Sequence, residues 1–369
     1  MVNDTVAAFN ATTTSNIPSA LELFRPQVEL YIIVTVTVGF GGALLILLLL
    51  CAMALGTQTR GGANILIVNL LLAEFIMCSS LVPHQAFSIY FPFARIEQTG
   101  CRYNYVIWMI LMSYSQWLTC ALAVNRVVAT LAPHYYYRTA SGSAIGLTIV
   151  FCWAVACACF LPFFFNTGGY YDSLPPWMSC SIRTSLPWAK LAMYTVGFYA
   201  PMAIMGTCYA LILLYVVGKR LRRPLGGAAG GDVFSQAERQ RLAIARMLMA
   251  SALWYYACYL PNTIVATSFY PVYVRYPLLQ LWLRTIFFLG YGGNPLIFFT
   301  MCKDYRNGLR SLGKRLRQTV GCAAKRPLSC GTVTPVKTTL VSVISAERSR
   351  GGEKDAAFGG VYYAADEEN

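Results

Sequence analysis

The sequence predicts an all-α membrane protein, a seven-transmembrane helix bundle followed by a short amphipathic eighth helix. Of the 369 residues, 57% are hydrophobic and only 12% are charged, about half the charged fraction of an ordinary soluble domain. Long stretches of the chain contain almost no Asp, Glu, Lys or Arg, and each exceeds the roughly 20 residues that cross a membrane as a helix. The basic residues gather on one side of these stretches.

The spans are defined by the gaps between charged residues. Two of them contain a single charged residue, Glu74 in the second and Arg284 in the seventh, and the others contain none. The ranges are 30–59, 64–90, 103–125, 139–171, 191–218, 248–274 and 277–302. A β-barrel does not fit, because its strands are about ten residues long and alternate in hydrophobicity. No internal repeat is visible, which weighs against a transporter built from duplicated halves.

The distribution of Lys and Arg sets the predicted orientation. Seven spans place the two ends of the chain on opposite sides, and the side of the carboxyl terminus carries most basic residues, including Arg60, Arg138 and the group from Lys219 to Arg246. Such residues stay on the cytoplasmic side, so we expect a multi-pass plasma-membrane protein with its amino terminus outside. The net charge of +14 then forms a cytoplasmic collar that attracts anionic lipids, without any need for a nucleic-acid partner.

Residues 1–29 form the expected extracellular tail. They lack the basic and apolar regions of a cleaved signal peptide, so we expect the first span to serve as an uncleaved anchor. Asn3 and Asn10 begin glycosylation sequons, which agrees with an outside location. Cys101 and Cys180 both fall in outer loops, where an oxidising compartment allows them to form a disulfide.

The seven-helix domain is expected to cover residues 30–302. Over 303–317, apolar residues recur at spacings of three and four within a basic segment, which predicts an amphipathic helix on the inner membrane surface. Residues 318–369 are polar and acidic at their end and predict a disordered cytoplasmic tail. Cys322 is a candidate for palmitoylation or a free thiol. Ser and Thr residues from Thr332 to Ser345 offer phosphorylation sites to a receptor kinase and arrestin, or belong to a solvated linker.

Landmark residues recur in order along the last five spans. They are Asn125-Arg126-Val127 with Pro133 and Tyr136, then Trp153, Pro162, Pro201, Tyr209, Cys258-Tyr259-Leu260-Pro261 and Asn294-Pro295-Leu296-Ile297-Phe298. In this order and spacing, over roughly residues 30–317, the chain resembles a rhodopsin-like (class A) G-protein-coupled receptor. The resemblance implies a receptor that converts binding of an extracellular ligand into activation of a heterotrimeric G protein.

The sequence departs from the family pattern at several landmarks. The family's Asp-Arg-Tyr is Asn125-Arg126-Val127, the Asn of the first helix is Gly42, the Asp of the second is Glu74, the Trp of the sixth is Tyr259 and the last Tyr of the seventh is Phe298. An Asn before the Arg is similar to the melatonin receptors and to the invertebrate moody and trapped-in-endoderm group. That single residue does not assign a branch.

The resemblance implies an activation switch at the inner end of the bundle. In the family, Arg126 would pair with the preceding Asp and with an acid at the base of the sixth helix, but these places hold Asn125 and Arg241. Glu238 is the nearby acid that could substitute. We therefore expect a weak inner lock and signalling without ligand; the alternative is that Asn125 caps a helix end and the inactive packing is normal. The moving parts are expected at Pro261 with Tyr259 and at Pro295 with Tyr291 and Asn294, because prolines permit kinks. In the family, the position of Tyr209 gains a water-bridged hydroxyl partner in the active state, and Phe298 cannot supply that hydroxyl.

Glu74 is the carboxylate deepest inside a span, and buried ionisable groups in lipid are functional candidates. By resemblance its neighbours are Ser115 and Asn294. A carboxylate, a hydroxyl and an amide are oxygen ligands suited to a sodium ion, which in the family stabilises the inactive state. The alternative is a protonated Glu74 that is hydrogen-bonded within a polar core. No other cofactor is expected.

The resemblance places the ligand among the outer halves of helices three, five, six and seven. The position of the Asp that binds amines is Trp108, so biogenic amines are disfavoured, and the position of the retinal-bearing Lys of opsins is Phe288, so a Schiff base is excluded. The candidate ligand contacts are Trp108, His84, Lys190 and Arg284. Arg284 would pair with an anionic group, such as an acidic lipid or a peptide carboxylate; alternatively it reaches the outer surface or pairs with Asp172 or Glu97.

Other chemistry has little support in the sequence. The chain has two His residues, on opposite sides of the membrane, and its Cys residues lie mainly in apolar spans, so no metal site is expected. No catalytic set is apparent, and we do not expect an enzyme. The rivals to a G-protein-coupled receptor are a seven-helix transporter, which needs a continuous polar path, and a receptor-like scaffold without G-protein coupling.

Overall fold

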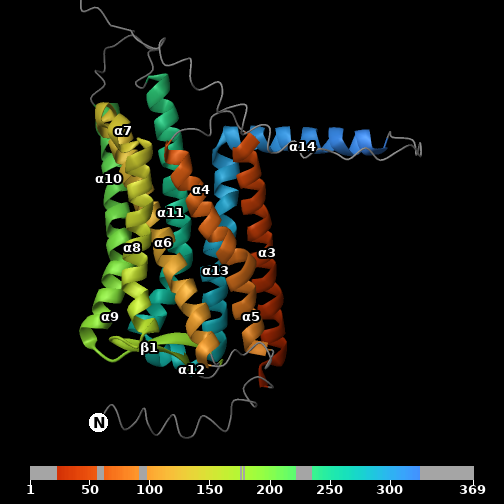
Figure 1. Cartoon of the computed structure of the whole chain (residues 1–369), viewed down its shortest axis with the longest axis vertical. Coiled ribbons are helices and arrows are strands. Elements are labelled where there is room, and N and C mark those ends of the chain that lie inside the picture. Colours follow the sequence, from red (N-terminus) through yellow and green to blue (C-terminus); the bar gives the residue numbers. More distant parts are fainter. Residues whose placement is uncertain are drawn as a thin grey trace, which may run out of the picture. The chain divides into compact units, whose positions relative to one another are not determined.

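The structure is a computed structural model, and it describes residues 23–55, 62–90, 98–174, 177, 179–221 and 235–324. The chain divides into two units, Met1–Leu316 and Arg317–Asn369. The first unit contains the helix bundle, whose helices run side by side (Figure 1). Of the second unit, only Arg317–Ala324 is described.

Each of the seven predicted spans coincides with helical structure in the described residues. The spans are α3 (Arg25–Leu55), α4 (Gly62–Ile76) with η1 (Met77–Leu81) and α5 (Val82–Tyr90), α6 (Gln98–Leu131), α8 (Gly142–Phe164), α9 (Pro187–Tyr194) with η3 (Thr195–Tyr199) and α10 (Ala200–Leu221), α11 (Gln236–Ser268) and α13 (Pro277–Met301). The connecting elements are α7 (Pro133–Thr139), strands β1 (Gly169–Leu174) and β2 (Ser179–Thr184), α12 (Tyr270–Arg275) and α14 (Lys303–Ala324).

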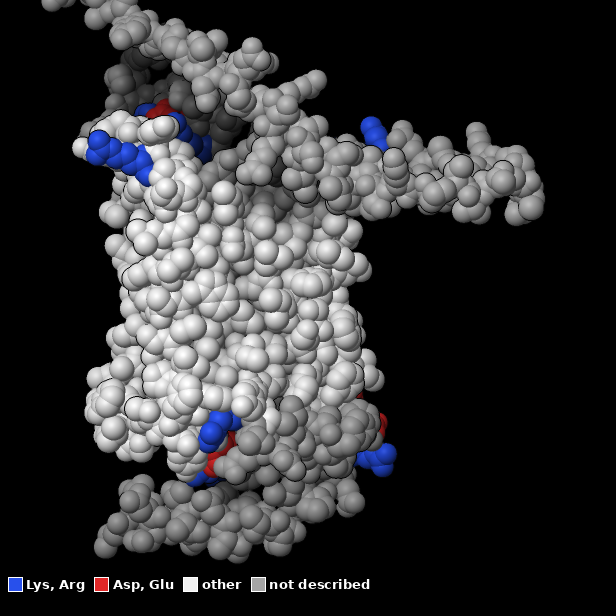
Figure 2. All heavy atoms as spheres, viewed as in Figure 1, with Lys and Arg blue, Asp and Glu red and all other residues white. Residues whose placement is uncertain are grey.

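The first five spans are long and apolar enough to cross a membrane. The helix α11 has 33 residues, although its first turns carry Glu238, Arg239 and Arg241. The helix α13 has 25 residues, most of them apolar, and carries the single charged residue Arg284; the segment Tyr305–Lys314 turns away from it by 91°. Figure 2 shows a broad uncharged band on the face in view, with charged side chains gathered at the two ends. This pattern confirms a multi-pass membrane bundle.

Two prolines explain two π-helical turns. Pro83 follows η1, and Pro201 follows η3. The ring of a proline clashes with the backbone carbonyl four residues earlier in a regular α-helix. A π-helical turn before the proline relieves this clash. In η3 the freed carbonyls have partners on α6: Ser113 Oγ donates to Gly197 O at 3.3 Å, and Trp117 Nε1 donates to Val196 O at 3.1 Å.

Glycines allow α13 to approach its neighbours closely. A Cβ added to Gly42 on α3 would lie 2.5 Å from Gly292 Cα, and a Cβ added to Gly293 would lie 2.9 Å from the Trp254 ring on α11. Cβ atoms do not approach non-bonded heavy atoms this closely, so neither position can carry a side chain without a shift of the helices. At Gly42, where the resemblance expects an Asn, α3 and α13 therefore lie too close for any side chain.

The core has a main cluster through the bundle and a smaller outer cluster. The outer cluster contains Val28, Tyr31, Ala86, Ile89, Trp177 and Leu281. It joins α3, α5, α13 and Trp177, whose indole nitrogen donates to Pro277 O at 3.0 Å. This cluster closes the bundle at the end that carries the β1–β2 hairpin, opposite α7 (Figure 1).

Some element boundaries differ from the sequence-based expectation. The prediction of an amphipathic helix over 303–317 was too short, because α14 continues to Ala324. The first span begins at Arg25 and not at residue 30. The outer loop after α8 contains an antiparallel hairpin, not predicted from the sequence, in which Tyr171 pairs with Ile182. Most of the predicted tails, 1–22 and 325–369, lie outside the described residues.

Candidate functional site

Arg126 lies near the inner end of α6 and is almost completely buried, with 4% of its surface exposed. Its guanidinium interacts with the Tyr136 hydroxyl on α7 and lies close to the phenols of Tyr209 and Tyr305. Its Nε has no hydrogen-bond partner among the described residues. Among the described residues, tyrosines therefore surround Arg126 at the place where the family has carboxylates.

Asn125 lies inside α6, which continues to Leu131. Its side chain is buried, and its Oδ1 has no hydrogen-bond partner in the described part of the chain. The alternative in which Asn125 caps a helix end is therefore wrong, because the helix does not end there. A buried amide oxygen without a partner costs free energy, so this position stabilises the described conformation little.

Arg241, on α11, donates from Nη1 to the backbone carbonyl of Ala129 on α6 at 3.3 Å. The bond connects the sixth and third spans at the inner end. A cation and a backbone carbonyl thus replace the ion pair that the family places between these helices. The Arg241 guanidinium is therefore directed to a backbone carbonyl of α6.

The expectation that Glu238 substitutes as a partner of Arg126 was wrong. Glu238 accepts from Lys219 Nζ on α10 at 2.6 Å and from the Tyr215 hydroxyl at 3.3 Å. It also completes a capping box, in which its Oε2 accepts from Ser235 N at 2.9 Å. The sequence shows that Glu238 lies among basic residues, but it does not identify Lys219 as the partner. That pairing depends on how α10 and α11 pack against each other.

The Lys219 ammonium and the Ser235 amide hold the pKa of the Glu238 carboxyl at about 2, well below its usual range. A lowered carboxyl pKa means that the interaction is complete above the ordinary pKa and is lost only as the pH falls toward the lowered value. The α10–α11 ion pair therefore remains intact at neutral and at mildly acidic pH.

The two other predicted switch residues of the inner end do not meet. The Tyr209 hydroxyl is buried without a hydrogen-bond partner among the described residues. Phe298 is completely buried, and its ring lies 6.2 Å from that of Tyr305 at the start of α14. Phe298 therefore fixes α14 to α13 and offers no hydroxyl to Tyr209.

Glu74 and Asn294 form the polar core that the sequence predicts. Asn294 Nδ2 on α13 donates to both carboxylate oxygens of Glu74 on α4, at 2.9 and 3.1 Å. Asn294 Oδ1 accepts from Ser251 Oγ on α11. One amide thus links three spans. Ser115 is buried on α6, but its Oγ has no hydrogen-bond partner in the described residues. Hydrogen bonds therefore join two of the three predicted sodium ligands, Glu74 and Asn294.

Three hydrogen bonds join α11 to α13, and their donors on α11 were not predicted from the sequence. Besides Ser251, Trp254 Nε1 donates to Leu289 O at 3.3 Å, and the hydroxyls of Tyr255 and Tyr291 lie 3.0 Å apart. The signal was present in the sequence, because Ser251 and Tyr255 are polar residues four apart on one helix face. The switch prolines Pro261 and Pro295 lie inside these same two helices.

An aromatic cluster fills the centre of the outer half. The Trp108 ring centroid on α6 lies 5.5 Å from Phe288, 5.9 Å from Phe287 and 6.2 Å from Tyr291. Tyr259 continues the cluster toward α11, 5.5 Å from Phe287. Trp108, predicted as a ligand contact, is thus buried and packs against Phe288, the position of the opsin lysine.

The other predicted ligand contacts lie apart from one another. His84 Nδ1 and Asn104 Nδ2 are 2.6 Å apart between α5 and α6. Lys190 is exposed on α9. Arg284 is half-buried beside Tyr273, Tyr31 and Tyr105.

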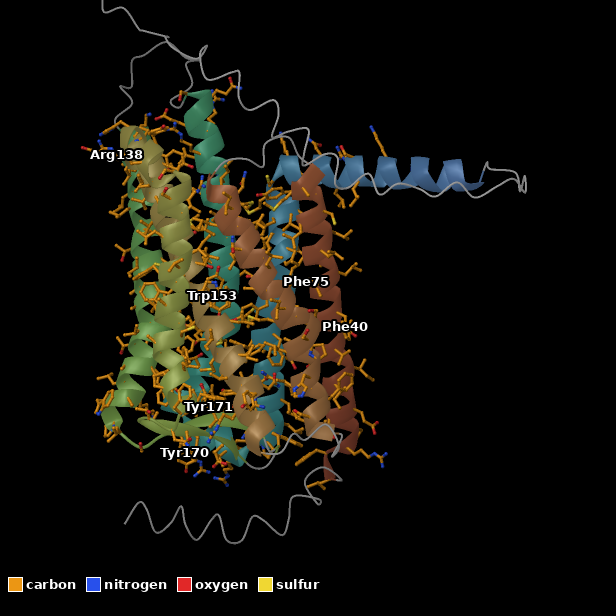
Figure 3. The ribbon with its side chains drawn as sticks, in the orientation of Figure 1. Phe40, Phe75, Arg138, Trp153, Tyr170 and Tyr171 are labelled. Atoms are coloured by element: carbon orange, nitrogen blue, oxygen red, sulfur yellow. The ribbon has the colours of Figure 1, made fainter. Side chains whose placement is uncertain are left out.

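Asp172, offered as an alternative partner of Arg284, forms an ion pair with Arg183 across the hairpin at 2.9 Å. Glu97 lies outside the described residues. Figure 3 places Tyr170 and Tyr171 of the hairpin at the end of the bundle opposite Arg138.

Several predictions fall partly or wholly outside the described residues. Cys180 is disulfide-bonded, but the side chain of Cys101 is not described, so their pairing stays a prediction. The glycosylation sites Asn3 and Asn10 and the side chain of Cys322 are also outside. Within the described residues, no group of three or more His, Cys, Asp or Glu is arranged to hold a metal ion.

Comparison with known proteins agrees with this geometry. Residues 41–295 match the model of the 7 transmembrane receptor (rhodopsin family). The chain is 23% identical to rhodopsin of Gallus gallus over 312 residues, which cover 79% of this chain and 81% of that protein. It is 24% identical to the blue-sensitive opsin of Conger conger over 268 residues, covering 68% and 71%.

The match extends over most of the chain and includes the inner end of α6, the polar core and the α13 landmarks Asn294 and Pro295. No particular branch of the family is identified by it. The chain therefore belongs to the rhodopsin family of seven-transmembrane receptors, and it is a receptor and not an enzyme.

Proposed function

We propose that this chain is a plasma-membrane receptor, with its amino terminus outside, that converts binding of an extracellular non-amine ligand into activation of a heterotrimeric G protein. Arg126 and the inner loops would contact the carboxy-terminal helix of the Gα subunit. The observation that carries the proposal is the buried Arg126 beside Tyr136, without an ion pair among the described residues.

This arrangement supports signalling without ligand. A charged group at the membrane rim is expensive unless it is paired or wetted, and opening of the inner face would hydrate Arg126 or give it a partner on the G protein. The described bond between α6 and α11 at this level is Arg241 to Ala129 O, worth about 1.5–3 kcal/mol at most. We therefore expect a substantial open population.

The test is ligand-free nucleotide exchange on a panel of Gα classes, for wild type beside Arg126→Ala at matched surface expression. The wild type should activate at least one class, and the substitution should reduce that signal about tenfold or more, since each 1.4 kcal/mol of lost interaction is a factor of ten. Arg275→Ala, at the exposed end of α12 on the outer side of the bundle, is the matched control and should signal. Silence of the wild type in every class would contradict a weak lock and favour a scaffold without coupling.

The polar core supports a sodium proposal in a modified form. Glu74 supplies carboxylate oxygens, and Ser115 Oγ is a buried oxygen without a partner among the described residues, both suited to a hard cation. Asn294, however, directs its Nδ2 to Glu74 and its Oδ1 to Ser251, and an amide N–H cannot ligate a cation. We assign Glu74 and Ser115 as ligands and Asn294 as the residue that orients Glu74.

If sodium stabilises the inactive state here, replacing choline by sodium should lower ligand-free nucleotide exchange of the wild type, and Ser115→Ala should respond less. Ser113→Ala, two positions away in sequence and a donor to Gly197 O of η3, controls for loss of a buried hydroxyl. Equal responses of all three proteins would contradict the site. A protonated Glu74 would instead make exchange insensitive to sodium.

Two features support the choice of ligand. The relatives are named rhodopsin and blue-sensitive opsin. In this chain the position of the opsin lysine holds Phe288, which is buried against Trp108, and α13 contains no lysine. We therefore propose no Schiff-base chemistry. Arg284 favours an anionic ligand group, because guanidinium groups bind carboxylates and phosphates well. Lys190 and His84 would belong to the entrance or to the rim.

The cytoplasmic side would bind further partners. We propose that a receptor kinase phosphorylates the tail beyond residue 325 and that arrestin binds it afterwards. The exposed basic residues of α14, among them Lys303, Arg306 and Arg310, would attract anionic lipid, and Cys322 would carry the palmitoyl group.

A further inference from the structure

The β1–β2 hairpin crosses the outer end of the bundle (Figure 1). Strand β1 contacts α6 and α8, and β2 contacts α5, α6 and α9. At the open end of the hairpin, Gly169 pairs with Thr184 and lies against Phe163 of α8. Trp177 lies between the two strands, at the opposite end of the hairpin. The hairpin therefore extends over the bundle from α8 to wherever Trp177 is attached.

Trp177 attaches this tip of the hairpin to the far side of the bundle. Its side chain is only 4% exposed and belongs to the outer cluster, together with Tyr31 of α3, Ala86 of α5 and Leu281 of α13. Its indole Nε1 donates to Pro277 O, at the start of α13, at 3.0 Å. A buried indole is favourable when its N–H has a partner. One side chain thus connects the hairpin to the first, second and seventh spans.

The other attachments of the hairpin lie along its strands. The Tyr171 hydroxyl donates to Phe160 O of α8 at 2.9 Å, and the Tyr171 ring lies 5.9 Å from that of Tyr105 on α6. Cys180 of β2 is disulfide-bonded. A two-stranded hairpin is only marginally stable by itself, so these contacts hold the strands in place. Release of Trp177 would free the tip, while Tyr171 and Cys180 would keep the strands anchored.

The aromatic cluster of the outer half lies beneath the hairpin. Tyr105, which contacts Tyr171 of β1, is followed on the same face of α6 by Trp108, three residues further into the bundle. Trp108 and its partner Phe288 are both buried. A water-soluble ligand that approaches the aromatic cluster from this end therefore has to displace part of the hairpin.

We propose that Trp177 is a releasable latch that controls access of water-soluble ligands to the aromatic cluster. While the indole is docked in the outer cluster, the tip of the hairpin covers the outer end of the bundle. When the indole leaves, the tip lifts and the entrance opens. Such local openings do not require the whole protein to unfold, because only a few contacts break. The apparent affinity of a ligand that enters this way is reduced in proportion to the undocked fraction.

The test measures how fast a water-soluble thiol reagent reaches a cysteine placed under the latch. Ala86→Cys introduces a small thiol at a completely buried position of the outer cluster. The purified receptor in bilayer discs is treated with trimethylammonioethyl methanethiosulfonate, which carries a permanent positive charge. Mass spectrometry of the peptide that contains position 86 gives the labelling rate. With Trp177 present, labelling should be slow, because the reagent has to wait for the latch to open.

Trp177→Phe keeps an aromatic ring in the outer cluster but removes the hydrogen bond to Pro277 O. Combined with Ala86→Cys, it should raise the labelling rate about fivefold, the effect of one ordinary hydrogen bond on an opening equilibrium. Trp177→Ala should raise the rate further. Tyr171→Phe is the matched control, because it also removes one buried hydrogen bond of the hairpin, but from a strand and not from the tip. It should leave the labelling rate near that of Ala86→Cys alone.

A native thiol in the same molecule separates release of the latch from loosening of the bundle. Cys152 is buried on α8, away from the outer cluster, and its labelling should stay slow in every variant. If Trp177→Ala does not fold, Trp177→Phe decides the matter.

Three results would overturn the proposal: labelling of Ala86→Cys at the same rate with and without Trp177→Phe, an equal acceleration by Tyr171→Phe, or an equal acceleration at Cys152. The discs expose both faces of the receptor and contain no G protein. The outcome is therefore independent of the orientation of the chain and of its coupling, which the Arg126→Ala comparison tests separately.

Discussion

Asn125 shows how one side chain changes the energetics of the inner end. The residue before Arg126 is buried inside α6, and its Oδ1 has no partner among the described residues. A carboxylate at this place would attract the guanidinium next to it in a region of low dielectric constant, where charges interact strongly. The neutral amide provides no such attraction, so the closed conformation lacks one of its usual restraints.

We predict that Asn125→Asp lowers ligand-free nucleotide exchange. A new charge pair at this buried position should stabilise the closed conformation by about 1 kcal/mol, which reduces the open population about fivefold. The measurement is basal exchange at matched surface expression, with Asn125→Ser as the neutral control. Exchange equal to that of the wild type in Asn125→Asp would mean that Arg126 does not limit opening.

The helix α13 shows how backbone contacts replace side-chain contacts. The Gly42 and Gly292 backbones leave no room for a Cβ between α3 and α13, since the ideal Cβ of Gly42 would lie 2.5 Å from Gly292 Cα. Small residues of this kind let membrane helices approach closely and gain dispersion energy. The first and seventh spans are thereby held together at the contact between Gly42 and Gly292.

We predict that Gly42→Ala destabilises the receptor by about 1–3 kcal/mol, the usual cost of overpacking a tight interface. Gly41→Ala is the matched control, because a Cβ at Gly41 would meet nothing within 4 Å. The thermal unfolding midpoint in detergent should fall for Gly42→Ala and stay near the wild-type value or rise slightly for Gly41→Ala. Equal midpoints of the two variants would show that α3 and α13 pack less tightly at Gly42 than the structure has them.

The elements differ in how far the sequence predicts them. The seven spans follow from charge-free runs because a membrane helix satisfies its own backbone, so local composition decides it. Glu74 and Asn294 were predicted as neighbours, and they are hydrogen-bonded. The β1–β2 hairpin and the pairing of Glu238 with Lys219 were missed because they depend on which segments meet in space. The extension of α14 to Ala324 was missed because the apolar repeat fades before the helix ends.

At the scale of the whole bundle, α11 is connected to three neighbours by polar contacts. Ser251, Trp254 and Tyr255 join it to α13, the Glu238–Lys219 pair joins it to α10, and Arg241 joins it to α6. These contacts resist different motions. If α11 swings outward together with α10, the Glu238–Lys219 pair can persist, whereas the Arg241 bond to Ala129 O must break.

We predict that Arg241→Ala raises ligand-free nucleotide exchange about threefold to tenfold. The range corresponds to about 0.7–1.4 kcal/mol, a conservative value for a charged hydrogen bond at a partly exposed site. Glu238→Gln is the comparison, because glutamine retains the capping box but loses the charge that holds Lys219. It should change exchange less than Arg241→Ala does, since the contact between α10 and α11 does not oppose their joint motion.

The comparison also distinguishes two models of the inactive state. If Glu238→Gln raised exchange and Arg241→Ala did not, the restraint on opening would lie between α10 and α11, and α11 would have to separate from α10 to admit the G protein. If both variants raised exchange additively, two independent restraints would oppose the same motion, as expected for sites without shared partners. Only the predicted order, with Arg241 dominant, identifies a charged side chain on a backbone carbonyl as the inner restraint of this receptor.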